Sequence, residues 1–227
     1  MGMFNFDNEQ SFVASTQQYL KAYTINEVKL TKIEKGVLKG SKDPNAEYQI
    51  VTLEFTGTEK NPGIFTTNLF IPTSEDDAKR PVFKNNEGHE YNRPSRAENF
   101  QYTLMQLMQV INPEGAKALL AKLNGKSVDT DTFIKSVIAV IDKKKEDTVT
   151  NLKLVGRNVN GTVYANLPNA CGLNKEGKLF PINFVGDTLF FSAYEEQQSK
   201  AVNSAQPTPV AKEEASGDEL GDLLSDL

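Results

Sequence analysis

The sequence predicts a mainly β body that carries a helical insertion and is followed by a disordered acidic tail. Three observations lead to this prediction: apolar residues alternate with polar ones before residue 72 and after residue 148, they recur at helical spacing over about 95–145, and acids concentrate near the C-terminus. The chain has 227 residues, of which 38% are hydrophobic and 24% charged. That size and composition favour one folded domain with a tail over two full cores.

Three strands are predicted first. Residues 27–38 are rich in β-branched residues and lysine, and residues 47–56 alternate strictly between apolar and polar side chains. The turn-forming residues 39–46 join these two segments as a hairpin. The turn at Asn61-Pro62-Gly63 then leads into a third strand over residues 63–71. We therefore expect a three-stranded antiparallel meander.

Helices are predicted to interrupt the strands. Residues 72–94 are polar and rich in turn formers, which predicts a long irregular loop. Ser95 and Glu98 have the spacing of a capping box, which predicts the start of the first helix. A second, shorter helix follows, and a third is expected over residues 132–144, where the β-branched content leaves a strand as the alternative.

A hairpin is predicted where the strands resume. Residues 149–159 and 162–167 flank Asn160-Gly161, a strong signal for a two-residue type I′ turn, because both turn positions need a positive φ. This turn fixes the register of the pair and sets Arg157 opposite Tyr164, on a face that Lys153 shares.

A last strand is predicted over residues 187–194 and brings the total to about six. Five or six antiparallel strands interrupted by one helical segment are typical of a small closed Greek-key barrel of the OB type, since closure removes the exposed sheet edges. We therefore expect an OB-like domain over residues 1–198, with its helical insertion at about 95–145.

The acidic residues are not spread evenly. The whole chain has a net charge of −5, and the segment from residue 199 onward holds two lysines against six acids. Residues 199–212, rich in Ser, Ala, Pro and Gln, are predicted to form a flexible linker. In residues 213–227 acids alternate with leucines, which indicates a tail that binds a protein partner. The alternative is a solubilising tail that has no partner.

The sequence argues against most catalytic and membrane functions. The single histidine and single cysteine, His89 and Cys171, cannot build a zinc cluster or an internal disulfide. Residues 125–127 lack the first glycine of a phosphate-binding loop. No apolar run approaches the roughly 18 residues of a membrane span, and no secretory pattern opens the chain. We expect no catalytic residue, no cofactor, no membrane contact and a cytoplasmic location.

Binding of a single-stranded nucleic acid has more support. Such strands are held by cations along the backbone and by aromatic rings on which bases stack, at roughly 1 to 3 kcal/mol per stacked base. The alternatives are a solvated surface for each cation and core packing for each ring, so the hypothesis requires these residues to converge on one sheet surface. The candidate residues are Lys29, Lys32, Lys35, Phe70, Arg80, Tyr91, Arg93, Arg96, Lys153, Arg157 and Tyr164.

The order of these parts, with a Pro/Ser/Ala/Gln linker and a tail ending GDELGDLLSDL, resembles the single-stranded DNA-binding proteins of bacteriophages that act in replication and recombination. The resemblance implies that the body binds single-stranded DNA, while the tail contacts replication or recombination proteins and competes with DNA. Many members end in acids followed by an aromatic residue, whereas this chain ends in Asp226-Leu227. The tail residues implied to bind the partner are Asp218, Glu219, Asp222, Leu223, Leu224, Asp226 and Leu227.

The sequence therefore predicts a non-enzymatic, sequence-tolerant single-stranded DNA-binding protein, which acts in the host cytoplasm if a phage encodes it. Two alternatives stay open at this point. One is a structural or packaged virion protein, which saturable strand binding would distinguish. The other is a carboxylate-dependent DNA-processing enzyme, which Mg²⁺-dependent turnover would reveal.

Overall fold

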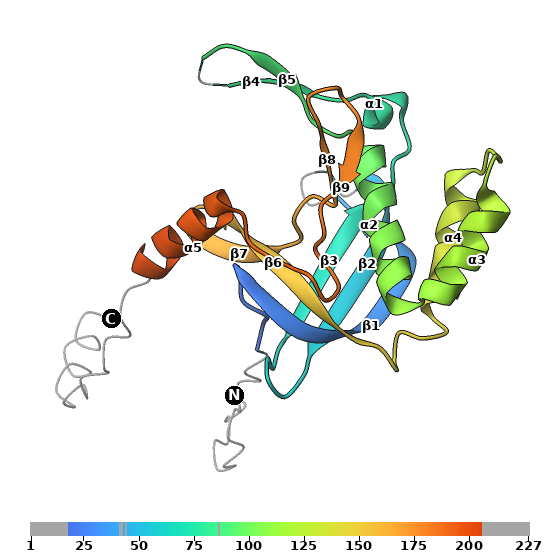
Figure 1. Ribbon diagram of the computed structural model, residues 1–227, viewed down its shortest axis with the longest axis horizontal. Coiled ribbons are helices and arrows are strands. Elements are labelled where there is room, and N and C mark those ends of the chain that lie inside the picture. Colours follow the sequence, from blue (N-terminus) through green and yellow to red (C-terminus); the bar gives the residue numbers. More distant parts are fainter. Residues whose placement is uncertain (1–17, 41–42, 44, 86, 206–227) are drawn as a thin grey trace, which may run out of the picture.

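A five-stranded antiparallel sheet with the strand order β3-β2-β1-β6-β7 organises the chain (Figure 1). The structure is a computed structural model, which describes residues 18–40, 43, 45–85 and 87–205. The strands of the sheet are β1 (Thr24–Lys39), β2 (Glu47–Gly57), β3 (Ile64–Phe70), β6 (Val149–Val159) and β7 (Thr162–Asn166). The predicted meander and the predicted hairpin are thus confirmed, and the two units share one sheet.

The remaining elements are short strands and helices. Two small antiparallel pairs are formed by β4 (Val82–Lys84) with β5 (Glu90–Asn92) and by β8 (Cys171–Leu173) with β9 (Leu179–Pro181). The helices are α1 (Glu75–Ala78), α2 (Arg96–Ile111), α3 (Pro113–Leu123), α4 (Thr130–Ile141) and α5 (Ala193–Ala205). Helices α2 to α4 confirm the predicted insertion, and α4 settles the choice between helix and strand for its segment.

Strand β1 holds the two halves of the sheet together. It pairs with β6 over Thr24–Lys29 and with β2 over Val28–Lys39. A bulge between Leu30 and Lys32 interrupts the pairing with β2. Because a bulge adds an unpaired residue, it bends the strand and reverses the side-chain alternation beyond it.

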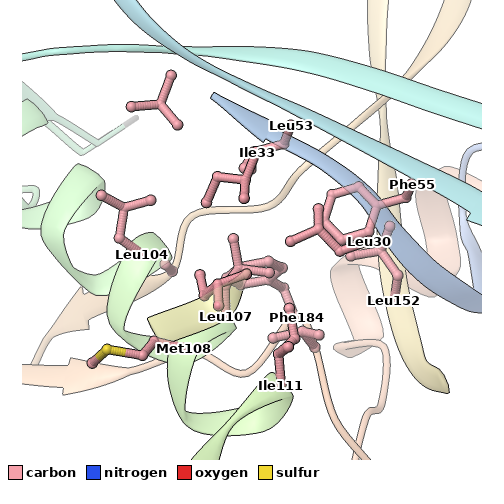
Figure 2. Packing of buried hydrophobic residues seen from close by; sticks show 14 of the residues in the cluster. Leu30, Ile33, Leu53, Phe55, Leu104, Leu107, Met108, Ile111, Leu152 and Phe184 are labelled. Atoms are coloured by element: carbon pink, nitrogen blue, oxygen red, sulfur yellow. The ribbon is translucent and has the colours of Figure 1, made fainter. Parts of the chain in front are cut away.

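Helices α2 and α4 pack on one face of the sheet, which we call the inner face. Figure 2 shows Leu104, Leu107 and Ile111 of α2 gathered near side chains of the sheet strands. The cluster includes Phe55 and Leu107, both fully buried, and Phe184 from the segment after β9. Burying a large apolar side chain stabilises the fold by about 1.5–3 kcal/mol, so this layer accounts for much of the stability.

The ends of these helices are fixed by side chains that the sequence identifies. The Ser95 hydroxyl accepts a hydrogen bond from the Glu98 N–H, and the Glu98 carboxylate accepts one from the Ser95 N–H. This confirms the predicted capping box at the start of α2. Asn112 caps α3 and Asp129 caps α4, and in each case the side-chain oxygen accepts one hydrogen bond from a backbone N–H of the first turn.

Several sequence-based expectations are corrected by the structure. The sheet is not closed into a barrel, because β3 and β7 do not pair with each other in the described part of the chain. Residues 187–194 do not form a strand; they run irregularly into helix α5. Helix α5 continues to Ala205, so residues 199–205 of the predicted linker are helical. Residues 72–94 contain α1 and the β4–β5 pair rather than a plain loop.

No helix among the described residues is long and apolar enough to cross a membrane. The chain before residue 18 and after residue 205 lies outside the described residues. This includes all the predicted acidic tail and its partner-binding residues.

The segment around β8 and β9 is attached to α2 by a buried glutamine. The side-chain amide of Gln106 donates to the carbonyls of Ala170, at 2.6 Å, and Ile182, at 3.1 Å. Its carbonyl oxygen accepts from the Phe184 N–H at 3.4 Å. The Ala170 carbonyl also accepts from the Ile182 N–H at 2.9 Å. Gln106 is 7% exposed, so the Ile182 carbonyl and the Phe184 N–H depend on it rather than on water.

Replacing Gln106 with leucine should therefore lower the free energy of unfolding by about 1–3 kcal/mol, because the Ile182 carbonyl and the Phe184 N–H lose their partner. Urea denaturation followed by far-UV circular dichroism measures the change. Gln109→Leu is the matched control, since Gln109 is exposed on the same helix and should change stability by less than about 0.5 kcal/mol. Equal losses in the two variants would contradict the role assigned to Gln106.

Candidate nucleic-acid interface

The face of the sheet opposite α2 and α4, here called the outer face, collects several of the predicted residues. Side chains of directly paired residues point to the same face of an antiparallel sheet. The pairs Phe70 with Ile50, Lys29 with Thr56 and Arg157 with Tyr164 follow this face across the strands. The predicted residues on the outer face that reach solvent are Lys29, Lys32, Phe70, Arg157 and Tyr164.

The hairpin prediction is confirmed in its register. Val159 pairs with Thr162 and Arg157 pairs with Tyr164, around a turn in which Asn160 and Gly161 both have positive φ. Tyr164 is 55% exposed. A flat aromatic ring therefore lies beside a guanidinium at this edge of the outer face.

Charge on the outer face is mixed. Lys32 forms an ion pair with Glu34 at 2.7 Å, and Glu54 lies directly across from Lys32 on β2. Lys29 and Arg157 have no acidic partner within 4.0 Å in the described part of the chain. Exposed ion pairs contribute little energy and exchange readily. The outer face thus offers two unpaired cations and one loosely held cation.

Two rings meet at the β3 edge of the sheet. Tyr48 and Phe70 contact each other edge to face, with ring centroids 5.8 Å apart. Their exposures are 47% and 44%. Because an edge-to-face pair leaves much of each ring open, both rings can offer a face to a planar ligand.

A second cluster lies on the β4–β5 pair, which we call the arm and which projects from the body in Figure 1. Phe83 and Tyr91 stack at 5.9 Å, and the Arg93 guanidinium lies 4.2 Å from the centre of the Phe83 ring. Arg93 also donates to the Tyr91 hydroxyl at 3.1 Å. All three side chains are exposed. Tyr91 and Arg93, two of the candidate residues, therefore lie together with Phe83 on the arm.

The base of the arm is braced by two ion pairs. Arg80 binds both carboxylate oxygens of Glu98, at 2.7 to 3.1 Å, and also donates to the Gly177 carbonyl. Arg96 pairs with Asp77 at 3.2 Å. The Ser74 hydroxyl and the N–H groups of Thr73 and Ser74 hold the pKa of the Asp77 carboxyl below its usual value, with a smaller effect from Arg96. Arg80 and Arg96 therefore hold the arm in position.

Lys35, a candidate for nucleic-acid binding, is not on the outer face. It pairs across β1 and β2 with the buried Val51, which places it on the inner face. Its ammonium group binds Asp131 of α4 at 2.6 Å. Lys135 and Lys35 together lower the pKa of Asp131 to about 2.

Lys153 lies on the outer face but is covered, which corrects its assignment as an accessible binding residue. Its ammonium group donates to the Phe190 carbonyl at 3.1 Å and to both Glu195 oxygens at 3.1 and 3.2 Å. The side chain is 4% exposed. Burial alone raises the pKa of Glu195, but hydrogen bonds from Ser192 and Lys153 outweigh burial and hold it below its usual value. The segment leading into α5 thus closes over β6.

Two functional features were missed from the sequence although signals for them existed. Ser192 and Glu195 have capping-box spacing and make its two hydrogen bonds, which marks a helix start inside the predicted last strand. In the arm, Phe83 pairs with Tyr91 across β4 and β5, and between these strands the Asn85 side chain accepts from the backbone N–H groups of Glu87 and His89.

No cluster of three or more histidine, cysteine or acidic side chains that could hold a metal occurs within the described residues. Cys171 is buried against α2, and burial raises the pKa of its thiol to about 11. The thiolate, which is the nucleophilic form, is therefore scarce near neutral pH.

Loss of the ion pair between Lys153 and Glu195 should free the start of α5 from strand β6. In Glu195→Gln the buried ammonium group loses its counter-charge, which is costly in a site that excludes water. We expect chymotrypsin to cut several-fold faster among Phe190, Phe191 and Tyr194, as followed by mass spectrometry of the fragments. Glu196→Gln, with the same charge change at the neighbouring exposed position, should be cut like the wild type. Equal rates for the two variants would show that the ion pair does not hold this segment.

Comparisons with known proteins add no identification to this surface. No protein-family model matches the chain, and neither a curated protein nor a solved structure does. The resemblance to phage single-stranded DNA-binding proteins thus has no support beyond the residues of the chain itself. What the outer face and the arm bind is a proposal argued from their geometry.

Proposed function

We propose that this protein binds single-stranded DNA without strong sequence preference and without catalysing a reaction, using the outer face of the sheet and the arm. The supporting observation is that Lys29, Phe70, Arg157 and Tyr164, from four different strands, all lie exposed on the outer face of one sheet, spread from its β3 edge to the β6–β7 hairpin. Sheet surfaces that hold single strands combine such cations with rings on which bases stack.

The number of strands and the position of the helical insertion support assignment of this sheet to the OB type, with the barrel left open. An OB-fold is a five-stranded, partly open Greek-key barrel, and its ligands bind on a strand face and on the loops beside it. This sheet has five antiparallel strands with the helical insertion between its third and fourth strands. On that assignment, the outer face and the loops at its ends are the surface proposed to bind the strand.

Stacking is expected to contribute more to affinity than charge does. The cations on the outer face and arm that lack an acidic partner in the described chain are Lys29, Arg93 and Arg157. The rings available to bases are more numerous and include Tyr48, Phe70, Phe83, Tyr91 and Tyr164, each at least 38% exposed. Because each stacked base contributes roughly 1 to 3 kcal/mol, a few rings suffice for useful affinity.

The acidic tail complements this proposal as a site for protein partners. Its residues Asp218 to Leu227 lie outside the described residues, so its role rests on its sequence. A short acidic segment punctuated by leucines suits recruitment of replication or recombination proteins. In that case DNA coating and partner recruitment reside in separate parts of the chain.

Titration by fluorescence anisotropy should show preference for a mixed-sequence single strand over the same sequence as a duplex, because duplex bases are already stacked. With about three phosphate-neutralising cations, the log of the binding constant should fall with log salt at a slope of about −2. The binding constant should therefore fall about 35-fold between about 50 and 300 mM salt. Equal affinity for duplex would argue against the proposal. Mg²⁺-dependent degradation of the strand would favour the alternative of a DNA-processing enzyme, and absence of saturable binding would favour a structural role.

The ring of Tyr164 should carry part of the affinity. Tyr164→Ala should weaken single-strand binding by roughly 1 to 3 kcal/mol while the melting temperature hardly changes, because the side chain is 55% exposed. Tyr164→Phe keeps the stacking surface and should bind like the wild type. A large fall in melting temperature with normal affinity would instead identify Tyr164 as a packing residue.

A further inference from the structure

The segment that leads into α5 lies over the outer face of the sheet at strand β6, beside which Figure 1 shows the helix. Strand β6 carries Val149, Lys153 and Arg157 on this face, since every second residue of a strand points the same way. Lys29 lies directly opposite Val149 on β1. Four residues of a strand span about 13 Å, so Lys153 is about midway along β6 between the levels of Lys29 and Arg157. The segment over Lys153 therefore lies in the gap between two exposed cations.

This segment is held in place by the buried ammonium group of Lys153. The group donates to the Phe190 carbonyl at 3.1 Å and to the Glu195 carboxylate at 3.1 and 3.2 Å. The same carboxylate accepts from the Ser192 N–H at 2.7 Å, so it caps α5 as well as binding Lys153. A buried ion pair adds little net stability, because the cost of desolvation offsets the attraction. What this pair provides is a fixed position for the segment.

The anchored segment leaves two aromatic rings in solvent. Phe190 is 73% exposed and Tyr194 is 69% exposed. The ring between them in sequence, Phe191, is partly buried, and its centre lies 5.5 Å from the Lys153 ammonium group. Neither Phe190 nor Tyr194 packs against another aromatic ring of the described chain. Since rings of this size contribute to stability by being buried, these two are available to a ligand instead.

The surroundings of these rings suit the bases of a single strand. Stacking on an aromatic ring tolerates any base, because every base has a flat face. Lys29 lies to one side of the segment, and Arg157 with its neighbour Tyr164 lies to the other. A strand whose phosphates contact both cations would pass over Phe190 and Tyr194.

We propose that Phe190 and Tyr194 form a stacking platform for the bound strand, and that Lys153 and Glu195 are positioning residues that hold this platform over β6. The inference rests on the proposed binding of single-stranded DNA. It places stacking residues between Lys29 and the β6–β7 hairpin, where the sheet itself presents a covered lysine. Lys153 then contributes to binding through the platform and not through a phosphate.

The rings are tested by fluorescence anisotropy of the full chain with a mixed-sequence single strand. Phe190→Ala and Tyr194→Ala keep the backbone of the segment, and each should weaken binding by roughly 5- to 150-fold, the loss of one stacked base. The melting temperature should hardly change, because both side chains are exposed. Tyr194→Phe keeps the stacking surface and should bind like the wild type.

The positioning role is tested by Glu195→Gln, in which glutamine can still cap α5 but no longer neutralises Lys153. This variant should bind the strand several-fold more weakly than the wild type. Glu196→Gln is the matched control, with the same charge change at the neighbouring exposed position, and should bind normally. As a readout that stability does not affect, a strand carrying 5-iodouracil is crosslinked by ultraviolet light, which joins this base to a ring on which it stacks. Mass spectrometry should find crosslinks at Phe190 or Tyr194 in the wild type and fewer of them in Glu195→Gln.

The outcomes separate this inference from the proposed function. Unchanged affinity in both alanine variants, or crosslinks that occur only at other rings, would overturn the platform while leaving strand binding intact. Tighter binding by Glu195→Gln would also overturn it, since the segment would then be a cover that keeps DNA away from β6. An unchanged dissociation constant in that variant would overturn the positioning role of Lys153 and Glu195. Failure of the wild type to bind the strand would overturn the proposed function itself.

Discussion

Strand β1 is the element on which the rest of the structure depends. Its 16 residues pair with β6 through the first part and with β2 through the second, and only Val28 and Lys29 pair on both sides. The backbone hydrogen bonds of two separate hairpins are therefore joined through one strand. Any shift in its register would move the side chains of both halves between the helix-covered face and the solvent face.

The two faces of the sheet differ sharply in how far they are covered. The inner face is sealed by α2 and α4, whose Leu107 and Ile134 are fully buried. On the outer face the segment before α5 folds over Lys153 and Ile50 is buried, whereas Lys29, Phe70, Arg157 and Tyr164 are exposed. Because the core is complete without covering the outer face, residues there are free to serve a ligand rather than stability.

Much of this arrangement could be predicted, since local signals determined it. Asn160-Gly161 fixed the register of a hairpin, and the Ser95 and Glu98 pair marked a helix start. The position of Lys35 could not be predicted, because the bulge after Leu30 reverses the alternation that would otherwise place Lys29 and Lys35 on one face. Residues 187–194 were predicted as a strand, but the ion pair with Lys153 and the cap at Ser192 favour a different path. The arm gave little signal, because its short strands are exposed throughout and carry no burial pattern.

The chain's one cysteine has a practical consequence for spectroscopy. Cys171 is buried, and its thiol is largely protonated at neutral pH, so thiol-reactive dyes should leave it unmodified in the folded protein. A cysteine introduced on the exposed surface of the arm, for example at Val82, would then be the single labelled position without removal of the native thiol. A fluorophore there would report the distance between the arm and a dye on a bound oligonucleotide, and so reveal the direction in which a strand lies across the protein.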